Sequence, residues 1–407
     1  MEEKKLVPKL RFPGFTEPWE QRKLGDLADG VFGGGTPKTS IDTYWNGSIP
    51  WIQSSNLMDD KIENFINDKS ITNLAIKESA TKLIPANSIA IVTRVGVGKV
   101  ALIREKFATS QDFLSFYCRH EHNPLFMAYQ ISRLMKVKSR LLQGTSIKGI
   151  TKSEVLESEV LIPKGAEEEI KIADFLSSCD TLITLHQRKL EHLKLKKKSL
   201  LQKLFPKEGE VYPELRFPGF TDPWEQRKLS DILVERNEQQ VETSEYPLMS
   251  FVQGIGVTPK GERYDRSFLV LDQSKKYKRT ELGDFIYSSN NLETGSIGIN
   301  KTGKAVISPV YSIFYGVSIG DSEFIGIMSL LPGFIAKMIR FRKGVVYGQW
   351  RIHEKDFLDI SVSIPSVDER TKITKLILSI EELITLHQRK LEHLQLLKKA
   401  LLQQLFV

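Results

Sequence analysis

One segment of the sequence occurs twice. Residues 11–24 read RFPGFTEPWEQRKL and residues 216–229 read RFPGFTDPWEQRKL, with one conservative difference. A second segment, LITLHQRKLEHL, occupies residues 182–193 and recurs without change at residues 383–394. Because both segments recur in the same order, the chain is predicted to consist of two equivalent halves.

Length and composition agree with two domains. The chain has 407 residues, whereas single hydrophobic cores stop growing at about 250–300 residues. Apolar residues at 41% and charged residues at 27% favour folded domains over disorder. Two cysteines without a CxxC pair argue against a disulfide framework or a zinc site, and no apolar stretch approaches a membrane span, so a cytoplasmic location is expected. The net charge of +8 permits an anionic partner.

The second repeated segment lies within a long helical pattern. From Ile172 and from Ile373, apolar residues recur at alternating steps of four and three, which is the spacing of a coiled-coil seam. A proline followed by acidic residues precedes each pattern, and acids suit the positive end of a helix dipole. Long helices are therefore predicted at residues 167–206 and 366–407.

The predicted seam contains polar residues. Its central positions are Ile183, His186, Leu190, Leu193, Ile384, His387, Leu391 and Leu394. Lys197 and Lys398 also fall on the seam, and a polar residue at such a position typically fixes register or orientation at some cost in stability. We expect the two helices to pack antiparallel against each other. A plain helical hairpin or a homodimerising coiled coil is equally compatible with the spacing.

The segments between the repeats differ from each other. Residues 30–160 and 235–360 share no obvious identity, although their edges match almost letter for letter. Strand-like runs bounded by Gly, Asn and Ser alternate with short helical patterns, which predicts an α/β (mixed α+β) fold in each segment. The predicted domains are residues 1–166 and 207–365, each followed by its long helix. A common scaffold would then present two different surfaces to one symmetric partner.

Catalytic and metal-binding motifs are not recognisable. VGVGKV at residues 95–100 lacks the glycine and the Ser or Thr of a phosphate-binding loop, so a strand-turn-strand hairpin is expected there. Asp59 and Asp60 are interpreted as a solvated turn, and the seven histidines show no metal-ligand spacing. The sequence has no glycine loop and no Asn/Asp-Pro-Pro-aromatic motif of the kind an adenine methyltransferase needs. We therefore predict no catalytic residue and no metal site.

The order of the motifs resembles that of a known family. WEQRKLGDL (19–27), GGTPKTSIDTYWNGSIPW (34–51) and LIPKGAEEEIKIADFLSSCDTLI (161–183) occur in a chain ordered as domain, long helix, domain, long helix. This arrangement resembles the specificity subunit of a bacterial type I restriction-modification system and covers essentially the whole chain. The family usually has Glu-Gln at the acidic helix start, where this chain has Glu168-Glu169 and Glu369-Arg370.

The resemblance implies a fold and a function. Two target recognition domains would be separated by two long antiparallel coiled-coil helices with internal pseudo-twofold symmetry, and each domain would read one half of a bipartite, non-palindromic double-stranded DNA site. The helices would dock two methyltransferase (modification) subunits, and restriction/translocase subunits would join them. The chain itself would be non-catalytic and would bind no cofactor, whereas its partners would use S-adenosylmethionine, ATP and Mg²⁺ for adenine-N6 methylation or ATP-dependent restriction. The alternative is a non-catalytic coiled-coil scaffold without DNA sequence specificity.

Polar loop residues are the candidate DNA contacts, because Arg and Lys suit guanine or phosphate and Asn and Gln suit adenine. In the first domain the candidates are Gln53, Ser54, Ser55, Arg94, Lys99, Gln111, Thr145, Ser146 and Lys148. In the second domain they are Asn290, Asn291, Thr294, Lys301, Lys304, Tyr347, Gln349 and Arg351. Among these, the turns QGTSIKG and YGQWRI are the preferred sites.

Overall fold

The computed structural model describes residues 6–142, 149–252, 255–259, 274–289, 292, 296–318, 320–346 and 349–407. The chain divides into two compact units: unit 1 comprises residues 1–187 and 389–407, and unit 2 comprises residues 188–388. Each long helix contributes residues to both units. The units therefore do not coincide with the four segments predicted from the sequence.

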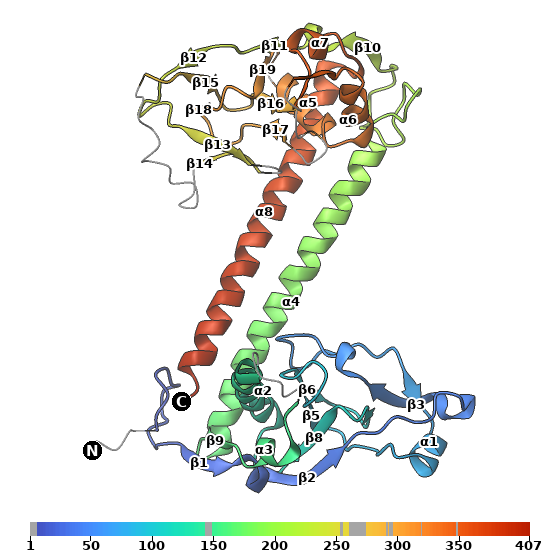
Figure 1. Cartoon of the computed structure of the whole chain (residues 1–407), viewed down its shortest axis with the longest axis vertical. Helices are drawn as coiled ribbons and strands as arrows, with labels where there is room; N and C mark the ends of the chain where they lie inside the picture. The colour runs from blue at the N-terminus through green and yellow to red at the C-terminus, as the bar shows by residue number, and fades with distance from the viewer. Residues whose placement is uncertain are drawn as a thin grey trace. The chain divides into compact units, whose positions relative to one another are not determined.

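A four-stranded antiparallel sheet forms the centre of unit 1 (Figure 1). Its strands, in sheet order, are β2 (Ala28–Gly33), β8 (Phe113–Cys118), β5 (Ser88–Val92) and β6 (Val100–Ile103). Both faces of β5 are buried, and helix α2 (Pro124–Leu142) packs on one of them. The expected hairpin at VGVGKV is confirmed as the β5–β6 turn, where Gly96 and Gly98 adopt the positive φ angles that the turn requires.

Smaller elements complete unit 1. They are the sheet of β4 (Ser70–Ile71), β3 (Trp45–Ile52) and β7 (Ala108–Thr109), the pair β1 (Glu20–Lys23) and β9 (Glu159–Ile162), and the helices α1 (Asn73–Glu78) and α3 (Lys152–Leu156). Strand β1 lies in the first repeated segment and pairs antiparallel with β9, directly before the long helix. The repeated segment thus closes the domain at the point where the helix begins.

Unit 2 repeats the same plan with different residues. Its four-stranded antiparallel sheet has the order β11 (Leu233–Glu235), β19 (Ser312–Gly316), β16 (Phe285–Tyr287) and β17 (Ile297–Ile299). Two short helices, α5 (Asp321–Met328) and α6 (Pro332–Ile339), take the place of α2, and the angle between them is 93°. The break is expected before Pro332, because proline cannot continue a helix. Strand β10 (Glu225–Lys228), in the second copy of the repeat, pairs with β22 (Ser361–Ile364) as β1 pairs with β9.

The remaining elements of unit 2 are short. They are the sheet of β12 (Gln239–Gln240), β15 (Tyr277–Thr280) and β18 (Ala305–Ile307), the pair β13 (Met249–Val252) and β14 (Gly256–Pro259), the pair β20 (Lys343–Val346) and β21 (Gln349–Arg351), and helix α7 (Glu354–Leu358). Mixed helix and strand content in both units confirms the predicted α/β class.

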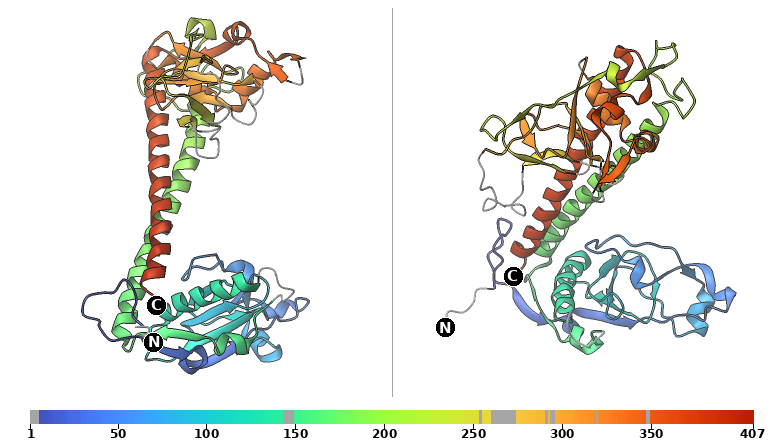
Figure 2. Two further views of the ribbon diagram at one scale, coloured as in Figure 1. Left: turned by 60° about the vertical axis from the view of Figure 1, so that its left-hand side comes forward. Right: turned by 45° about the horizontal axis from the view of Figure 1, so that its top comes forward.

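Two helices of 38 residues each correspond to the predicted long helices. They are α4 (Ala166–Lys203) and α8 (Val367–Gln404), and within each unit their segments lie side by side (Figure 2). Unit 1 combines the start of α4 with the end of α8, so the segments run antiparallel there, and unit 2 combines the other halves. The predicted seam residues Ile183, Leu190, Leu193 and Leu391 are buried, whereas His186, Ile384, His387 and Leu394 are half-buried.

The last turn of a long helix completes the core of each unit. In unit 1 the Phe406 ring stacks on Phe126 at 5.4 Å and meets Trp19 edge-on at 6.1 Å. In unit 2 the Phe205 ring, which follows α4, stacks on Phe324 at 5.6 Å and meets Trp224 edge-on at 5.8 Å. Because each tryptophan belongs to a copy of the repeated segment, the repetition of that segment has a packing reason.

The repeated segment also fastens to the start of its long helix. Arg11 donates two hydrogen bonds to the Glu168 carboxylate, at 2.7 and 2.8 Å, and Arg216 makes the same pair of contacts with Glu369. Such a bidentate contact fixes the relative orientation of the two side chains as well as the distance between them. The aromatic residues assist, since Phe12 in unit 1 packs edge-on against Phe175 of α4 at 5.8 Å. The repeated segment therefore fixes the entry of the chain onto the start of the long helix.

The seam lysines bind carboxylates of the opposite helix. In unit 2 Lys197 Nζ lies 2.6 Å from Glu381 Oε1, and in unit 1 Lys398 forms an ion pair with Asp180. Lys398 also donates to the backbone oxygen of Asp60 at 3.1 Å, and Tyr129 Oη donates to Asp180 Oδ2 at 2.6 Å. The polar interruption of the seam is thus a cross-helix contact, which specifies the antiparallel register.

Lys398→Met should destabilise unit 1, because it leaves the Asp180 carboxylate without its cation. Since Asp180 retains 22% exposure, the expected cost is about 2–3 kcal/mol, below the value for a fully buried pair. Thermal unfolding measures it. Lys399→Met, at the adjacent exposed position, is the matched control, and the double variant Lys398→Met with Asp180→Asn should recover part of the loss. Equal effects of the two single variants would contradict this role of Lys398.

Candidate nucleic-acid interface

Three connecting loops of unit 1 meet at one end of its central sheet. They are the 3₁₀ turn Ser54–Asn56 after β3, the β5–β6 turn at residues 93–99, and the β7–β8 turn at residues 110–112. Backbone hydrogen bonds join them: the Ser110 amide donates to the Ile52 carbonyl at 2.9 Å, and the Thr93 amide donates to the Asp112 carbonyl at 2.8 Å. We call this group of loops the unit 1 loop cluster.

The structure brings six predicted DNA contacts into the unit 1 loop cluster. They are Gln53, Ser54, Ser55, Arg94, Lys99 and Gln111. Arg94, Ser55 and Gln111 are exposed, and Val95 at the tip of the β5–β6 turn is 71% exposed. Loops that project polar and cationic side chains from a rigid sheet are suited to contacting a nucleic acid.

Several of these side chains already have partners within the protein. Lys99 Nζ donates to the Leu57 carbonyl at 2.9 Å and to the Ser54 carbonyl at 3.4 Å, so it ties the β5–β6 turn to the 3₁₀ turn. The Gln111 side chain accepts a hydrogen bond from Thr36 Oγ1 at 2.7 Å. Lys99 therefore positions the loops, whereas Arg94 is the exposed cation of the turn.

The preferred turn QGTSIKG precedes a segment that contacts the same loops. Its candidates Thr145, Ser146 and Lys148 lie outside the described residues. The chain resumes at residue 149, and the Ile150 amide donates to the Thr93 carbonyl at 2.8 Å, within the unit 1 loop cluster.

Unit 2 repeats this placement around the β16–β17 turn. The candidates Asn290, Asn291 and Thr294 follow β16 in the sequence, but they lie outside the described residues, as does Tyr347. The side chain of Gln349 is not described either, and Arg351 is exposed. The chain that leaves β21 binds beside the turn, since the Ile352 amide donates to Ser289 Oγ at 2.9 Å and Tyr287 Oη donates to the Ile352 carbonyl at 3.3 Å. The preferred turn YGQWRI therefore leads to the position that QGTSIKG leads to in unit 1.

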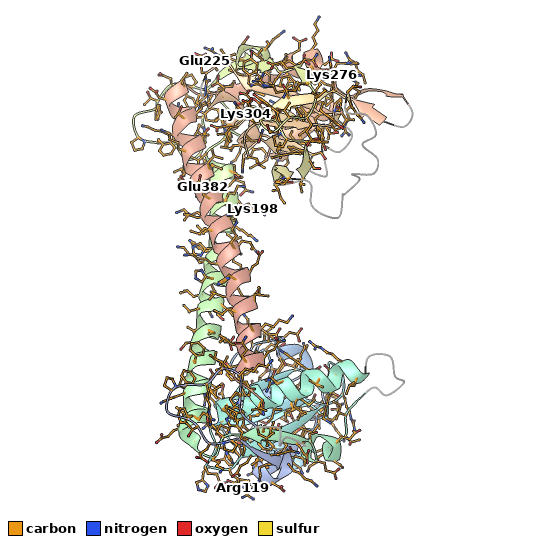
Figure 3. All side chains as sticks on the ribbon, turned by 90° about the vertical axis from the view of Figure 1, so that its left-hand side faces the viewer. Arg119, Lys198, Glu225, Lys276, Lys304 and Glu382 are labelled. Carbon is orange, nitrogen blue, oxygen red and sulfur yellow. The ribbon has the colours of Figure 1, made fainter. Side chains whose placement is uncertain are left out.

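Two candidates lie away from this turn. Lys301 and Lys304 follow β17, at its opposite end, and they form ion pairs with Glu381 of α8 and with Glu245. The sequence places them on loops but does not indicate at which end of the sheet a loop lies. Figure 3 labels Lys304, whose side chain is exposed.

Lys69 is a residue of the unit 1 site that the sequence did not single out. Its Nζ atom donates to Gln53 Oε1 at 3.4 Å and lies 5.8 Å from the centre of the Trp51 ring. It reaches this place through the irregular β3–β4 pairing. Nothing in its local sequence indicates that pairing.

Within the described ranges no three His, Cys, Asp or Glu side chains are grouped as a metal ion would require. No single helix in the described part of the chain is long and apolar enough to cross a membrane; α5 and α6 reach that composition only together, and both contribute buried side chains to the core of unit 2.

Comparison with known proteins shows which family the chain resembles. Residues 16–195 match the family described as "Type I restriction modification DNA specificity domain". This part of the chain is similar to that family. The match includes most of unit 1 with its loop cluster, and the resemblance inferred from the sequence motifs is confirmed.

Relatives extend the comparison. The chain is 28% identical over 224 residues to the type I restriction enzyme MjaIX specificity subunit of Methanocaldococcus jannaschii, covering 53% of this chain and 51% of that protein. It is 32% identical over 173 residues to the EcoR124I/EcoR124II specificity subunit of Escherichia coli, covering 40% and 41%. The alignments thus span about half the length of these relatives or less.

A solved structure extends the likeness in fold to the whole chain. The S subunit of a type I restriction-modification system from M. genitalium matches with a TM-score of 0.66 and 16% identity, covering 98% of this chain and 99% of that one. At this identity the likeness concerns the fold, and it includes both units and the long helices.

Lys99→Met should loosen the unit 1 loop cluster, because the carbonyls of Ser54 and Leu57 lose a charged donor. Amide hydrogen exchange at residues 53–58 should accelerate by about tenfold, equivalent to roughly 1.4 kcal/mol. Lys77→Met, at an exposed position of α1, should leave exchange in this segment unchanged. Unaltered exchange in the Lys99 variant would show that the two hydrogen bonds do not hold the loops.

Proposed function

We propose that the chain is the DNA specificity subunit of a type I restriction-modification complex. Each unit binds one half of a bipartite, non-palindromic double-stranded DNA site. The observation that carries this proposal is the contrast between framework and loops: the segments that close each domain and fasten it to its helix are nearly identical, whereas the loops at the same end of each central sheet differ. Different loops on one framework suit the recognition of two different half-sites.

The chemistry of the loops supports readout of bases. Arg94 is exposed on a turn held by Lys99, and an arginine can donate two hydrogen bonds to a guanine in the major groove. The candidates of unit 2 include asparagines, whose amide pairs with adenine in the same way. The net charge of +8 favours contact with phosphates and makes binding sensitive to salt.

Exposed leucines support docking of partner subunits on the long helices. Leu182 and Leu185 of α4 are 46% and 60% exposed, and their copies Leu383 and Leu386 of α8 are 44% and 46% exposed. Figure 3 labels Lys198 and Glu382, exposed charged residues of the same two helices in unit 2. Identical exposed apolar residues in both helices suit two copies of one partner, which we propose to be the methyltransferase subunit.

In this proposal the chain supplies recognition and its partners supply catalysis. Methyltransferase subunits would use S-adenosylmethionine to methylate adenine at N6, and restriction/translocase subunits would use ATP and Mg²⁺. The complex would act on DNA in the bacterial cytoplasm. The alternative, a coiled-coil scaffold indifferent to DNA sequence, accounts for the helices but gives the divergent loops no role.

Arg94→Ala in the complex with methyltransferase subunits should weaken binding to the selected duplex by about tenfold, because one bidentate base contact is lost. Sequencing of duplexes selected from a random library should show relaxed preference in one half-site only. Arg104→Ala is the matched control, since Arg104 is exposed at the other end of β6 and pairs with Glu63 at 2.7 Å.

Two results would contradict the proposal. Duplexes selected by the unaltered complex without any common motif would favour the scaffold. Relaxed preference in both half-sites of the Arg94 variant would contradict the assignment of one half-site to each unit.

Leu185→Lys and Leu386→Lys should each remove one methyltransferase subunit from the purified complex, because a charge is placed on an apolar contact. Mass measurement by light scattering would then show one bound subunit in place of two. The Tm of the lone chain should stay within about 2 °C, because substitutions at exposed positions cost little. Gln202→Lys, at an exposed polar position of α4, is the control. Retention of both subunits in either leucine variant would place the docking surface elsewhere.

A further inference from the structure

The first turns of α4 and α8 hold their domains through two consecutive side chains. The first is the same in both helices, because Glu168 and Glu369 each bind the arginine of the repeated segment with the same geometry. The second is different: an acid, Glu169, in α4 and a base, Arg370, in α8. This reversal of charge stands within an otherwise similar framework, at a position that contacts the divergent domain.

In unit 1, Glu169 accepts hydrogen bonds from the domain. Its side chain is fully buried, with Oε1 2.9 Å from His122 Nδ1 and Oε2 2.7 Å from the Asn123 amide that donates to it. The hydrogen bond to Glu169 raises the pKa of His122 above its ordinary value, although burial opposes the rise. Asn123 in turn caps α2, since its Oδ1 accepts hydrogen bonds from the first amides of that helix. The domain of unit 1 therefore presents donors to the start of α4.

In unit 2 the polarity of the contact is opposite. Arg370 is 8% exposed, and its Nη2 atom lies 2.8 Å from Oδ1 of Asp321, which is 2% exposed. Asp321 is the first residue of α5, and its Oδ2 accepts a hydrogen bond from the Ser318 amide at 2.9 Å. The domain of unit 2 therefore presents a carboxylate to the start of α8.

The two contacts are mutually exclusive. With the domain of unit 2 at the start of α4, Asp321 would face Glu169 and two carboxylates would share a buried site. With the domain of unit 1 at the start of α8, the donors of His122 and Asn123 would face a guanidinium that accepts no hydrogen bond. A buried charge without a partner is strongly destabilising.

We propose that residues 169 and 370 form a charge key that assigns each domain to its own long helix. The start of α4 fits a domain that presents hydrogen-bond donors, and the start of α8 fits a domain that presents an acid. This assignment concerns folding of the chain and holds whether or not the units bind DNA. It implies that a domain moved between the two positions needs the matching residue at the helix start.

The first test reverses the charge in the otherwise unaltered full chain. Glu169→Arg should lower the Tm by about 6–12 °C, the range expected for loss of a buried charged contact. Glu167→Arg is the matched control, because it makes the same charge change in the same helical turn at an exposed position. The control variant also loses the favourable interaction of an acid with the helix dipole, and this loss is expected to lower its Tm by about 2 °C. Equal shifts in the two variants would overturn the proposal.

The second test exchanges a domain. Residues 235–360 replace residues 30–160 in the full chain, in one version with Glu169 retained and in another with Glu169→Arg. The version with Glu169→Arg should unfold at least about 5 °C above the other, or should be the only one recovered in soluble form. Glu169→Gln should give an intermediate Tm, because an amide both donates and accepts.

Each outcome bears on the proposal. A higher Tm for the exchanged chain with Glu169 retained, or the same Tm in both versions, would overturn it. If neither exchanged chain is soluble, the comparison of Glu169→Arg with Glu167→Arg decides, since both are made in the native arrangement of domains.

Discussion

Each unit depends on an aromatic contact made by the end of a long helix. Phe406 fills the core of unit 1 between Trp19 and Phe126, and Phe205 occupies the equivalent place in unit 2. Burial of such rings contributes much of the stability of a core. Unit 1 thus joins the first and last segments of the chain, and it cannot complete its core from residues 1–187 alone. The long helices are in this respect parts of the domains.

This constraint explains which parts of the sequence are repeated. One short segment holds three features that both units need. It contains a tryptophan that packs against the helix end, an arginine that binds the helix start and a strand that closes the domain. Among the described residues, the loops at the far end of the sheet make none of these contacts. They can therefore differ between units without loss of the framework, as the proposed recognition of two half-sites requires.

Polar groups within the packed interfaces add direction to the apolar contacts. Leucines along α4 and α8 would tolerate several registers, whereas the contact of Lys197 with Glu381 and that of Lys398 with Asp180 fit one register. At the helix starts the same principle acts between helix and domain, through Glu169 and Arg370. Charged side chains in these places lower the gain from burial but exclude competing arrangements.

The sequence alone determined the two-part organisation, because two segments recur in the same order. It also determined the long helices and their seam, because apolar residues spaced 3.5 apart follow from the geometry of packed helices. It also indicated the loops Gln53–Ser55 and Arg94–Lys99, since polar residues between strands mark turns. Only the tertiary structure decided that Lys99 holds a loop, that Lys301 binds Glu381, and that Glu169 and Arg370 serve different domains. These outcomes depend on which strand end or domain surface meets a given side chain, and such contacts join residues far apart in the chain.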